Sequence, residues 1–394
     1  MTPRLYRIAE WLALFGLLGL ALTMGLGKGP HRAFFDITAI AFFLLAGLHL
    51  KTEHRLPAGV VAAIGLSVCY LLLFTLNPQA EADPRTLRYI VAFAVISGAL
   101  ALLPGRPLLQ ARLHTPTLVL FLTTAAVVGV ILMQWVTGRP HAFFINPHFL
   151  VFHCVMAVLL AGWFAVVMTD WRRYLAIATG LAALIQMLLL QSAIGFLSLV
   201  IAVGTLSLVY LRRPALVGGW VAAALVAVTL TLSVNWARSP DERLNAPVQE
   251  SGYVLKDERS VLWIDTLRMQ RDSELLAWFV GHGPDAFGDA YIQYSSFNRA
   301  LDFVFPHNFF LEALYSFGLI GLIAFTLGLA VFTITFALDL YRSPTPRAQL
   351  GWMLFVAAFV YTFLSLPMLS RYPVYTLAFI VGYCLWQARM RERG

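Results

Sequence analysis

A histidine and an asparagine, His307 and Asn308, come directly before a long apolar run and are the residues best placed to do chemistry. An ionisable side chain at a membrane edge is costly to keep there, so function is the default hypothesis for His307. Pro306 suits the first position of a helix, where its missing N–H is not needed. We therefore predict a helix that begins at Pro306, with His307 and Asn308 in its first turn.

Two chemical roles stay open for His307 in that position. The positive end of a helix dipole disfavours imidazolium, which would keep His307 neutral and able to accept a proton. The same end attracts anions such as phosphate, and a bound pyrophosphate would favour imidazolium instead. At about 100° per residue, Gly318 returns to nearly the azimuth of His307 on one helix. Gly318 and Gly321 would then let a second helix approach closely.

A second group of candidates lies in the long segment 236–306, before His307. Its middle, 256–279, is predicted to form one or two amphipathic helices, which would lie on the membrane surface or roof a cavity. Arg259 and Trp263 lie in this middle part. His282 lies between two glycines in a turn. Aromatic residues interleaved with arginine suit sugars and phosphates, although a single aromatic more often belongs to a membrane interface belt.

The elements that must position these residues are membrane spans. The chain has 394 residues, of which 60% are hydrophobic and 12% charged, whereas a soluble domain is nearer half apolar and a quarter charged. A span needs about 20 apolar residues. The sequence predicts an all-α polytopic membrane protein divided into 1–235, 236–306 and 307–394. About twelve spans are predicted, at 8–27, 33–50, 57–76, 88–105, 115–137, 149–169, 174–192, 193–211, 216–235, 318–340, 349–369 and 373–388.

The placement of basic residues predicts the orientation. With a cytoplasmic amino terminus, the inside segments carry roughly 15 lysines and arginines and the short outside loops roughly 6, as the positive-inside rule requires. Both termini are then cytoplasmic, and the segment 236–306 is a large loop on the outer face. The net charge of +8 follows from this topology and does not indicate nucleic acid. The outside connections carry Lys28, Arg32, Arg85, Arg88, Arg139 and Arg371.

Several chemistries are absent from the sequence pattern. The three cysteines, Cys69, Cys154 and Cys384, all fall inside predicted spans, so no disulfide framework is expected. The chain has no Cys/His spacing typical of zinc, no phosphate-binding glycine loop and no dinucleotide fingerprint. We expect neither a metal nor a cofactor, and no use of ATP.

The ordered motifs resemble the signature of the bacterial O-antigen ligase family, which is related to O-antigen polymerases and O-linked oligosaccharyltransferases. These motifs are Arg259-x3-Trp263, Gly281-x-Gly283-x3-Phe287 and His307-Asn308-x9-Gly318-x2-Gly321, after the large outside loop. Together with the span pattern, the resemblance covers most of the chain. It implies a GT-C-like fold in the bacterial inner membrane, with the active site facing the periplasm.

The resemblance also implies an activity, namely an inverting, metal-independent glycosyltransferase. Such an enzyme moves O-antigen glycan from undecaprenyl pyrophosphate onto the lipid A–core oligosaccharide. By analogy, His307 would activate the acceptor hydroxyl or hold the donor pyrophosphate, and Arg259 would bind phosphate. Asn308, Trp263 and His282 are further candidates for substrate binding. Asp285 and Asp302 are possible orienters of His307, whereas His153 is better explained as a packed histidine within a span.

One position departs from the family pattern. The family usually places Ser-Arg in the tight outside turn between the middle spans, whereas this chain has Gln191-Ser192-Ala193, without arginine. Another cation would have to take that role. Arg371 is attractive because it stands between two spans, although a snorkelling residue is the common alternative. The outside cations placed to substitute are Arg139, Arg371, Lys28 and Arg32.

Other functions fit the same sequence less well. A polymerase that joins lipid-linked glycans is the nearest alternative. A protein-directed oligosaccharyltransferase would be expected to carry an additional outside domain. A lipid or glycan transporter would be expected to have ionisable residues at mid-membrane and repeated spans, and neither pattern is evident in the sequence.

Overall fold

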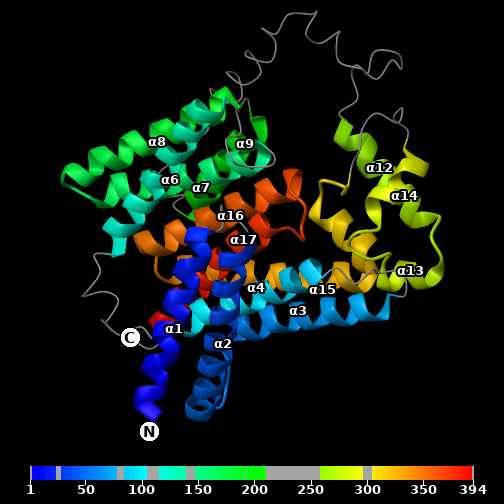
Figure 1. Cartoon of the computed structure of the whole chain (residues 1–394), viewed down its shortest axis with the longest axis horizontal. Coiled ribbons are helices and arrows are strands. Elements are labelled where there is room, and N and C mark those ends of the chain that lie inside the picture. The colour runs from blue at the N-terminus through cyan, green and yellow to red at the C-terminus, as the bar shows by residue number, and fades with distance from the viewer. Residues whose placement is uncertain are drawn as a thin grey trace, which may run out of the picture.

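The computed structural model describes residues 2–23, 28–77, 84–103, 115–138, 147–190, 192–209, 258–295 and 304–392. Within these ranges every regular element is a helix (Figure 1). The helices are α1 (Thr2–Thr23), α2 (Lys28–Glu53), α3 (Ala58–Leu76), α4 (Pro84–Leu102), α6 (Thr115–Thr137), α7 (Pro147–Val167), α8 (Trp171–Leu189), α9 (Ala193–Val209), α12 (Glu258–Arg271), α13 (Leu275–Val280), α14 (Phe287–Tyr294), α15 (Phe309–Arg342), α16 (Pro346–Ser365) and α17 (Arg371–Glu392).

Eight helices in the described ranges are long and apolar enough to cross a membrane. The predicted all-α polytopic membrane protein is therefore confirmed. Each predicted span coincides with a helix except 216–235, which lies outside the described residues. The tight turn predicted near Gln191-Ser192 includes Gln191, which lies outside the described residues; α8 ends at Leu189, α9 begins at Ala193, and Gly195 N–H donates to the Ser192 hydroxyl at 3.2 Å. The predicted amphipathic segment forms two helices, α12 and α13.

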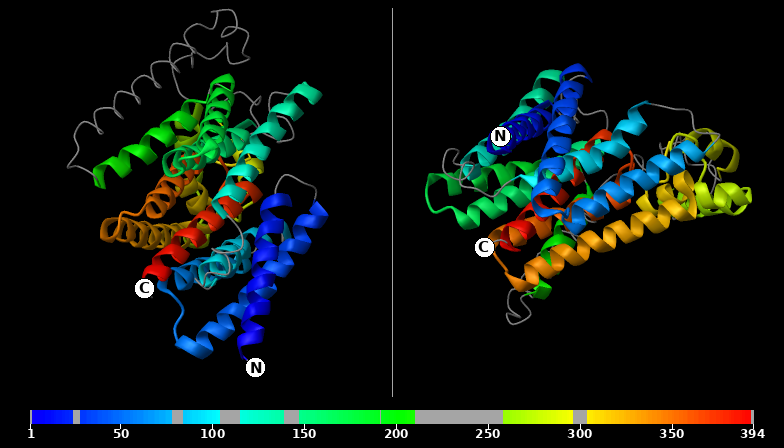
Figure 2. Two further views of the ribbon diagram at one scale, coloured as in Figure 1. Left: turned by 90° about the vertical axis from the view of Figure 1, so that its left-hand side faces the viewer. Right: turned by 90° about the horizontal axis from the view of Figure 1, so that it is seen from below.

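The long helices pack closely in pairs, with α17 against α4 and α16, and α7 against α8. The Tyr361 hydroxyl of α16 donates to the His148 carbonyl of α7 at 2.9 Å and ties these two groups together. Figure 2 shows α3 and α15 running alongside each other toward α12, α13 and α14 at one end of the bundle. We call that end the loop face.

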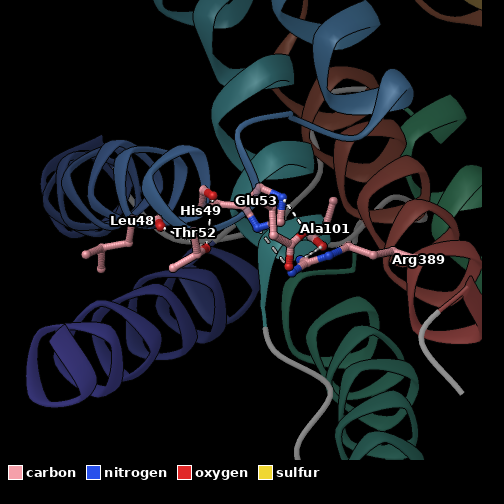
Figure 3. A network of polar contacts seen from close by, with 6 residues as sticks. All are labelled: Leu48, His49, Thr52, Glu53, Ala101 and Arg389. Atoms are coloured by element: carbon pink, nitrogen blue, oxygen red, sulfur yellow. Dashed lines mark hydrogen bonds and ion pairs between the residues drawn. The ribbon is translucent and has the colours of Figure 1, made fainter.

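Away from the loop face, a buried polar network joins the ends of three helices (Figure 3). Arg389 of α17 is 6% exposed, and its guanidinium donates to the Ala101 carbonyl of α4 at 2.9 Å. It also lies 3.4 Å from Nδ1 of His49 on α2. Because a guanidinium only donates, Nδ1 of His49 is the acceptor, and the opposite nitrogen, Nε2, contacts Glu53 at 3.1 Å. One side chain thus joins the ends of α2, α4 and α17.

Replacing Arg389 with lysine is expected to lower the free energy of unfolding by about 1–3 kcal/mol, since its two contacts use different guanidinium nitrogens and the one nitrogen of lysine cannot occupy both positions. The measurement is thermal or denaturant unfolding of the purified protein in detergent. Arg342→Lys is the matched control, because Arg342 is exposed at the end of α15. Equal stability of the two variants would show that the network does not hold these helix ends.

Candidate active site

His307 precedes α15 in an unusual backbone conformation. Its φ is +52°, in the left-handed region that residues with a side chain adopt at a cost of about 1–3 kcal/mol and mostly at functional sites. Asn308 is the N-cap, and its Oδ1 accepts from Phe310 N at 3.0 Å and from Leu311 N at 3.2 Å. The prediction that the helix begins at Pro306 is wrong, because the asparagine side chain caps the helix two residues later. His307 therefore lies outside the first turn.

The cap also narrows what Asn308 can do. The side chain is 7% exposed and its oxygen is occupied by the two backbone N–H groups of α15. Any contact with a substrate would have to come from its amide nitrogen. The substrate-binding role of Asn308 therefore stays a prediction, while its structural role as a cap is clear.

The imidazole of His307 is oriented by the connection between α16 and α17. Its Nδ1 lies 3.2 Å from the carbonyl oxygen of Ser365. A carbonyl only accepts, so Nδ1 carries the proton and the lone pair of the neutral ring is on Nε2. The Phe305 ring packs against the imidazole with centroids 4.1 Å apart. This geometry suits a neutral histidine that accepts a proton at Nε2.

Helix α12 holds the residue before His307. The Trp263 indole N–H donates to the carbonyl of Pro306 at 3.1 Å. Arg259 lies one turn earlier on α12, at the spacing that places two residues on one helix face. The structure thus brings the helix of Arg259 and Trp263 to His307, and it gives Trp263 a role in positioning the backbone there.

The glycine turn docks directly on α15. Gly281 and Gly283 both have positive φ, 82° and 95°. His282 N donates to Tyr315 O at 2.8 Å and Gly283 N to Ser316 O at 3.0 Å. These carbonyls are available because α15 is broken at Gly318, which has φ 66° and ψ −167°. The loop backbone therefore takes the place of the interrupted helix.

The close approach of a second helix predicted at Gly318 is confirmed, and that helix is the short α13. A Cβ at Gly318 would clash with the backbone of Phe279 and Val280, at the end of α13, rather than with another span. A Cβ at Gly281 would clash with the backbone of Ser316 and Phe317. The prediction that His307 and Gly318 share one face of a helix is wrong, since no single helix connects them. The two glycines instead let a loop and a span touch backbone to backbone.

His282 fastens the same turn through its side chain. Its Nε2 lies 2.7 Å from the Ser273 hydroxyl, and its ring stacks on Tyr315 with centroids 4.5 Å apart. His282 also lines a cavity of about 310 Å³, beside Asp272, Glu274 and Tyr294. Burial lowers the pKa of His282. Its substrate-binding role stays a prediction, whereas its part in holding the turn is visible.

Acidification is expected to loosen the glycine turn. Because the pKa of His282 is lower in the folded protein, the unfolded chain takes up a proton first, and the contribution of His282 to stability is lost as the pH falls below about 6.5. Hydrogen exchange of residues 273–283, corrected for intrinsic rates, should quicken between about pH 7.5 and about pH 5.5. His282→Gln should flatten this dependence. An unchanged slope in that variant would place the titration elsewhere.

Glu312 is the functional candidate that the sequence interpretation missed. It is 6% exposed on α15, and its carboxylate accepts from Met368 N at 2.7 Å and from Leu369 N at 3.4 Å. His307 and Glu312 thus hold two points of the same connection, residues 365–370 between α16 and α17. One signal could have found it, because Glu312 is an acidic residue within an apolar run.

Two hydroxyls in that connection have no hydrogen-bond partner within the described ranges, namely those of Ser365 and Ser370, both buried. Ser365 is 1% exposed and supplies the carbonyl that orients His307. Buried hydroxyls normally find partners. These two hydroxyls are therefore exceptions within the connection that orients His307.

Three of the predicted cations lie on α17 and α2. Arg371 is the first residue of α17 and follows Ser370 directly. Lys28 begins α2, and Arg32 is exposed on it. The His31 ring stacks on Tyr375 of α17 with centroids 4.9 Å apart, so the start of α2 lies beside the first turns of α17.

The remaining candidates are less closely connected with His307. Arg139 and Asp302 lie outside the described residues. Asp285 is exposed and accepts from the Thr86 hydroxyl at 3.3 Å. His153 contacts the Phe149 carbonyl at 2.7 Å and packs against Phe152 and Tyr372. Among the described residues, no group of three or more His, Cys, Asp or Glu side chains could hold a metal ion.

The fold and the site together define a multi-pass membrane protein that carries an oriented histidine at the start of one span. A family profile described as O-antigen ligase matches residues 175–326, from α8 to the middle of α15. The match contains all three motifs that carry the resemblance, so this part of the chain is similar to the O-antigen ligase family. No curated protein matches the chain. The family implies ligase or polymerase activity on lipid-linked glycans in a membrane.

Proposed function

We propose that this protein is an O-antigen ligase, an inverting, metal-independent glycosyltransferase. It moves O-antigen glycan from undecaprenyl pyrophosphate onto the lipid A–core oligosaccharide. One observation carries the proposal: within the segment matched to the family, His307 donates through Nδ1 to Ser365 and thereby presents Nε2 as a base.

In the proposed reaction, Nε2 of His307 takes the proton from an acceptor hydroxyl while the hydroxyl oxygen attacks the anomeric carbon of the donor sugar. The bond from that carbon to the phosphate oxygen breaks, and undecaprenyl pyrophosphate leaves with the electron pair. Attack opposite to the leaving group inverts the anomeric centre. Pyrophosphate is already a good leaving group, so the protein needs only a base, positioning and cationic stabilisation.

The cationic stabilisation falls in this proposal to Arg259 and Arg371. Arg259 lies on α12, whose Trp263 contacts Pro306, and Arg371 follows the connection that orients His307. Arg371 would thus take the role of the family arginine that is missing at Ala193.

The proposed location is the bacterial inner membrane, with both termini in the cytoplasm and the loop face toward the periplasm. The excess of lysine and arginine at the opposite ends of the helices supports this orientation. It would place His307 on the side where lipid-linked glycans and lipid A–core meet.

The test uses purified protein in lipid nanodiscs with a lipid-linked glycan donor and with chelator present, without ATP. Lipid A–core is offered as one acceptor and a second lipid-linked glycan as the other. A ligase forms the lipid A–core product. Chain extension of the lipid-linked glycan alone would assign the polymerase activity of the same family instead, and transfer to neither acceptor would overturn the proposal.

A further inference from the structure

Helix α13 (Leu275–Val280) turns an apolar side outward. Leu275 is 75% exposed, Leu276 is 59% exposed and Phe279 is 46% exposed. At about 25 cal/mol per Å², leaving three large apolar side chains in water forgoes a substantial stabilisation. Contiguous exposed apolar residues on a folded protein usually mark a contact surface.

The position of α13 relative to α3 indicates what covers this surface. α3 has 19 residues, which at 1.5 Å per residue span about 28 Å, close to the thickness of a bilayer core. Its C-cap, Asn77, therefore lies near the membrane boundary. The Asn77 amide donates to the Gly281 carbonyl at 2.9 Å, so the residue that ends α13 lies at that boundary too. Figure 1 shows α13 at the end of α3.

Helix α15 independently indicates that the end of α13 lies at the membrane boundary. Gly318 touches the backbone of Phe279 and Val280, and the stretch from Leu319 to Arg342 rises by about 36 Å, enough to cross the core. Directly after Gly318, α15 exposes apolar residues that a span turns toward lipid, namely Leu319, Ile320, Ile323 and Leu327. The backbone of Phe279, whose side chain is exposed, thus lies next to the beginning of this lipid-facing surface.

We propose that α13 lies in the interface of the bilayer at the loop face, with Leu275, Leu276 and Phe279 among the lipid chains. The partner is the lipid surface itself. Apolar faces of short helices bury by several ångströms into this region of a membrane. In this position α13 would hold the start of the Gly281–Gly283 turn at the membrane. The proposal does not depend on the proposed glycan transfer.

The test places spin labels on cysteine variants of the full chain in nanodiscs. Leu275→Cys and Phe279→Cys are compared with Ile323→Cys, an exposed position of a span, and with Gln293→Cys, an exposed position of α14. Labels at 275 and 279 should be accessible to oxygen and shielded from a water-soluble nickel chelate, as at 323. Accessibility like that at 293 would overturn the proposal. Dipolar coupling between the labels at 275 or 279 of two protein copies would also overturn it, because a second copy would then cover this surface.

A second measurement uses the unmodified sequence. Lipids with a photoreactive group in the acyl chain, near the headgroup, should form crosslinks with peptides that contain residues 275–279. Crosslinks confined to the long spans would overturn the proposal, even if a labelled variant fails to fold.

Discussion

Replacing His307 with alanine is expected to slow glycan transfer by about 10²–10⁴-fold, the usual contribution of a general base. The variant should stay folded, because Asn308 still caps α15 and the glycine turn still docks on Tyr315 and Ser316. The imidazole lost is the group that Ser365 orients. The measurement is the transfer rate at saturating donor and acceptor, with unfolding followed in the same preparation.

His54 provides a matched control. Within the described residues, His54 and His307 are the non-glycine residues with positive φ, 55° and 52°. His54 is exposed in the connection between α2 and α3, so His54→Ala removes an imidazole from similar backbone geometry and should leave transfer unchanged. Wild-type transfer by a folded His307→Ala variant would make the assignment wrong.

His307→Gln separates the two roles that remained open in the sequence. Glutamine can still donate to Ser365 or contact a phosphate, but it cannot accept a proton at neutral pH. If His307 acts as the base, the glutamine variant should transfer glycan as slowly as the alanine variant. If glutamine restored most of the rate, His307 would act as a ligand of the donor pyrophosphate instead.

Local sequence patterns were sufficient for the helices and for the region of the site. Apolar runs of about 20 residues specify spans regardless of their neighbours, and glycines at 281, 283 and 318 mark places where backbones come close. The start of α15 was harder, because Pro306 and Asn308 are both helix-start signals. Asn308 prevails because its oxygen satisfies two N–H groups at once.

What the sequence could not supply are contacts between distant segments. The kink at Gly318 is completed by the distant glycine turn, whose His282 and Gly283 N–H groups donate to the carbonyls of Tyr315 and Ser316. Glu312 meets Met368 and Leu369 from another helix pair, and no local period reveals that pairing. The side of α13 that faces outward was likewise unpredictable, since Leu275 and Phe279 fit either a core or a membrane surface.

Replacing Glu312 with alanine is expected to free the connection between α16 and α17 from α15. The change leaves the N–H groups of Met368 and Leu369 without their acceptor, at about 1–3 kcal/mol for each buried group. Because the same connection orients His307 through the Ser365 carbonyl, the turnover rate should fall as well as the stability. Hydrogen exchange of residues 366–370 should quicken in the variant.

Two comparisons separate positioning from packing. Glu312→Gln keeps one oxygen that can accept from Met368, so its turnover should lie between those of the wild type and the alanine variant. Glu274→Ala removes an exposed carboxylate that makes no capping bond to α13 and should change neither the turnover rate nor the stability.

The test compares kcat at equal folded fractions. A less stable Glu312→Ala variant with wild-type kcat would show that Glu312 only packs the two helix pairs together. Unchanged exchange at 366–370 would show that it does not hold the connection, whereas a fall in kcat restored by glutamine would show that Glu312 positions His307.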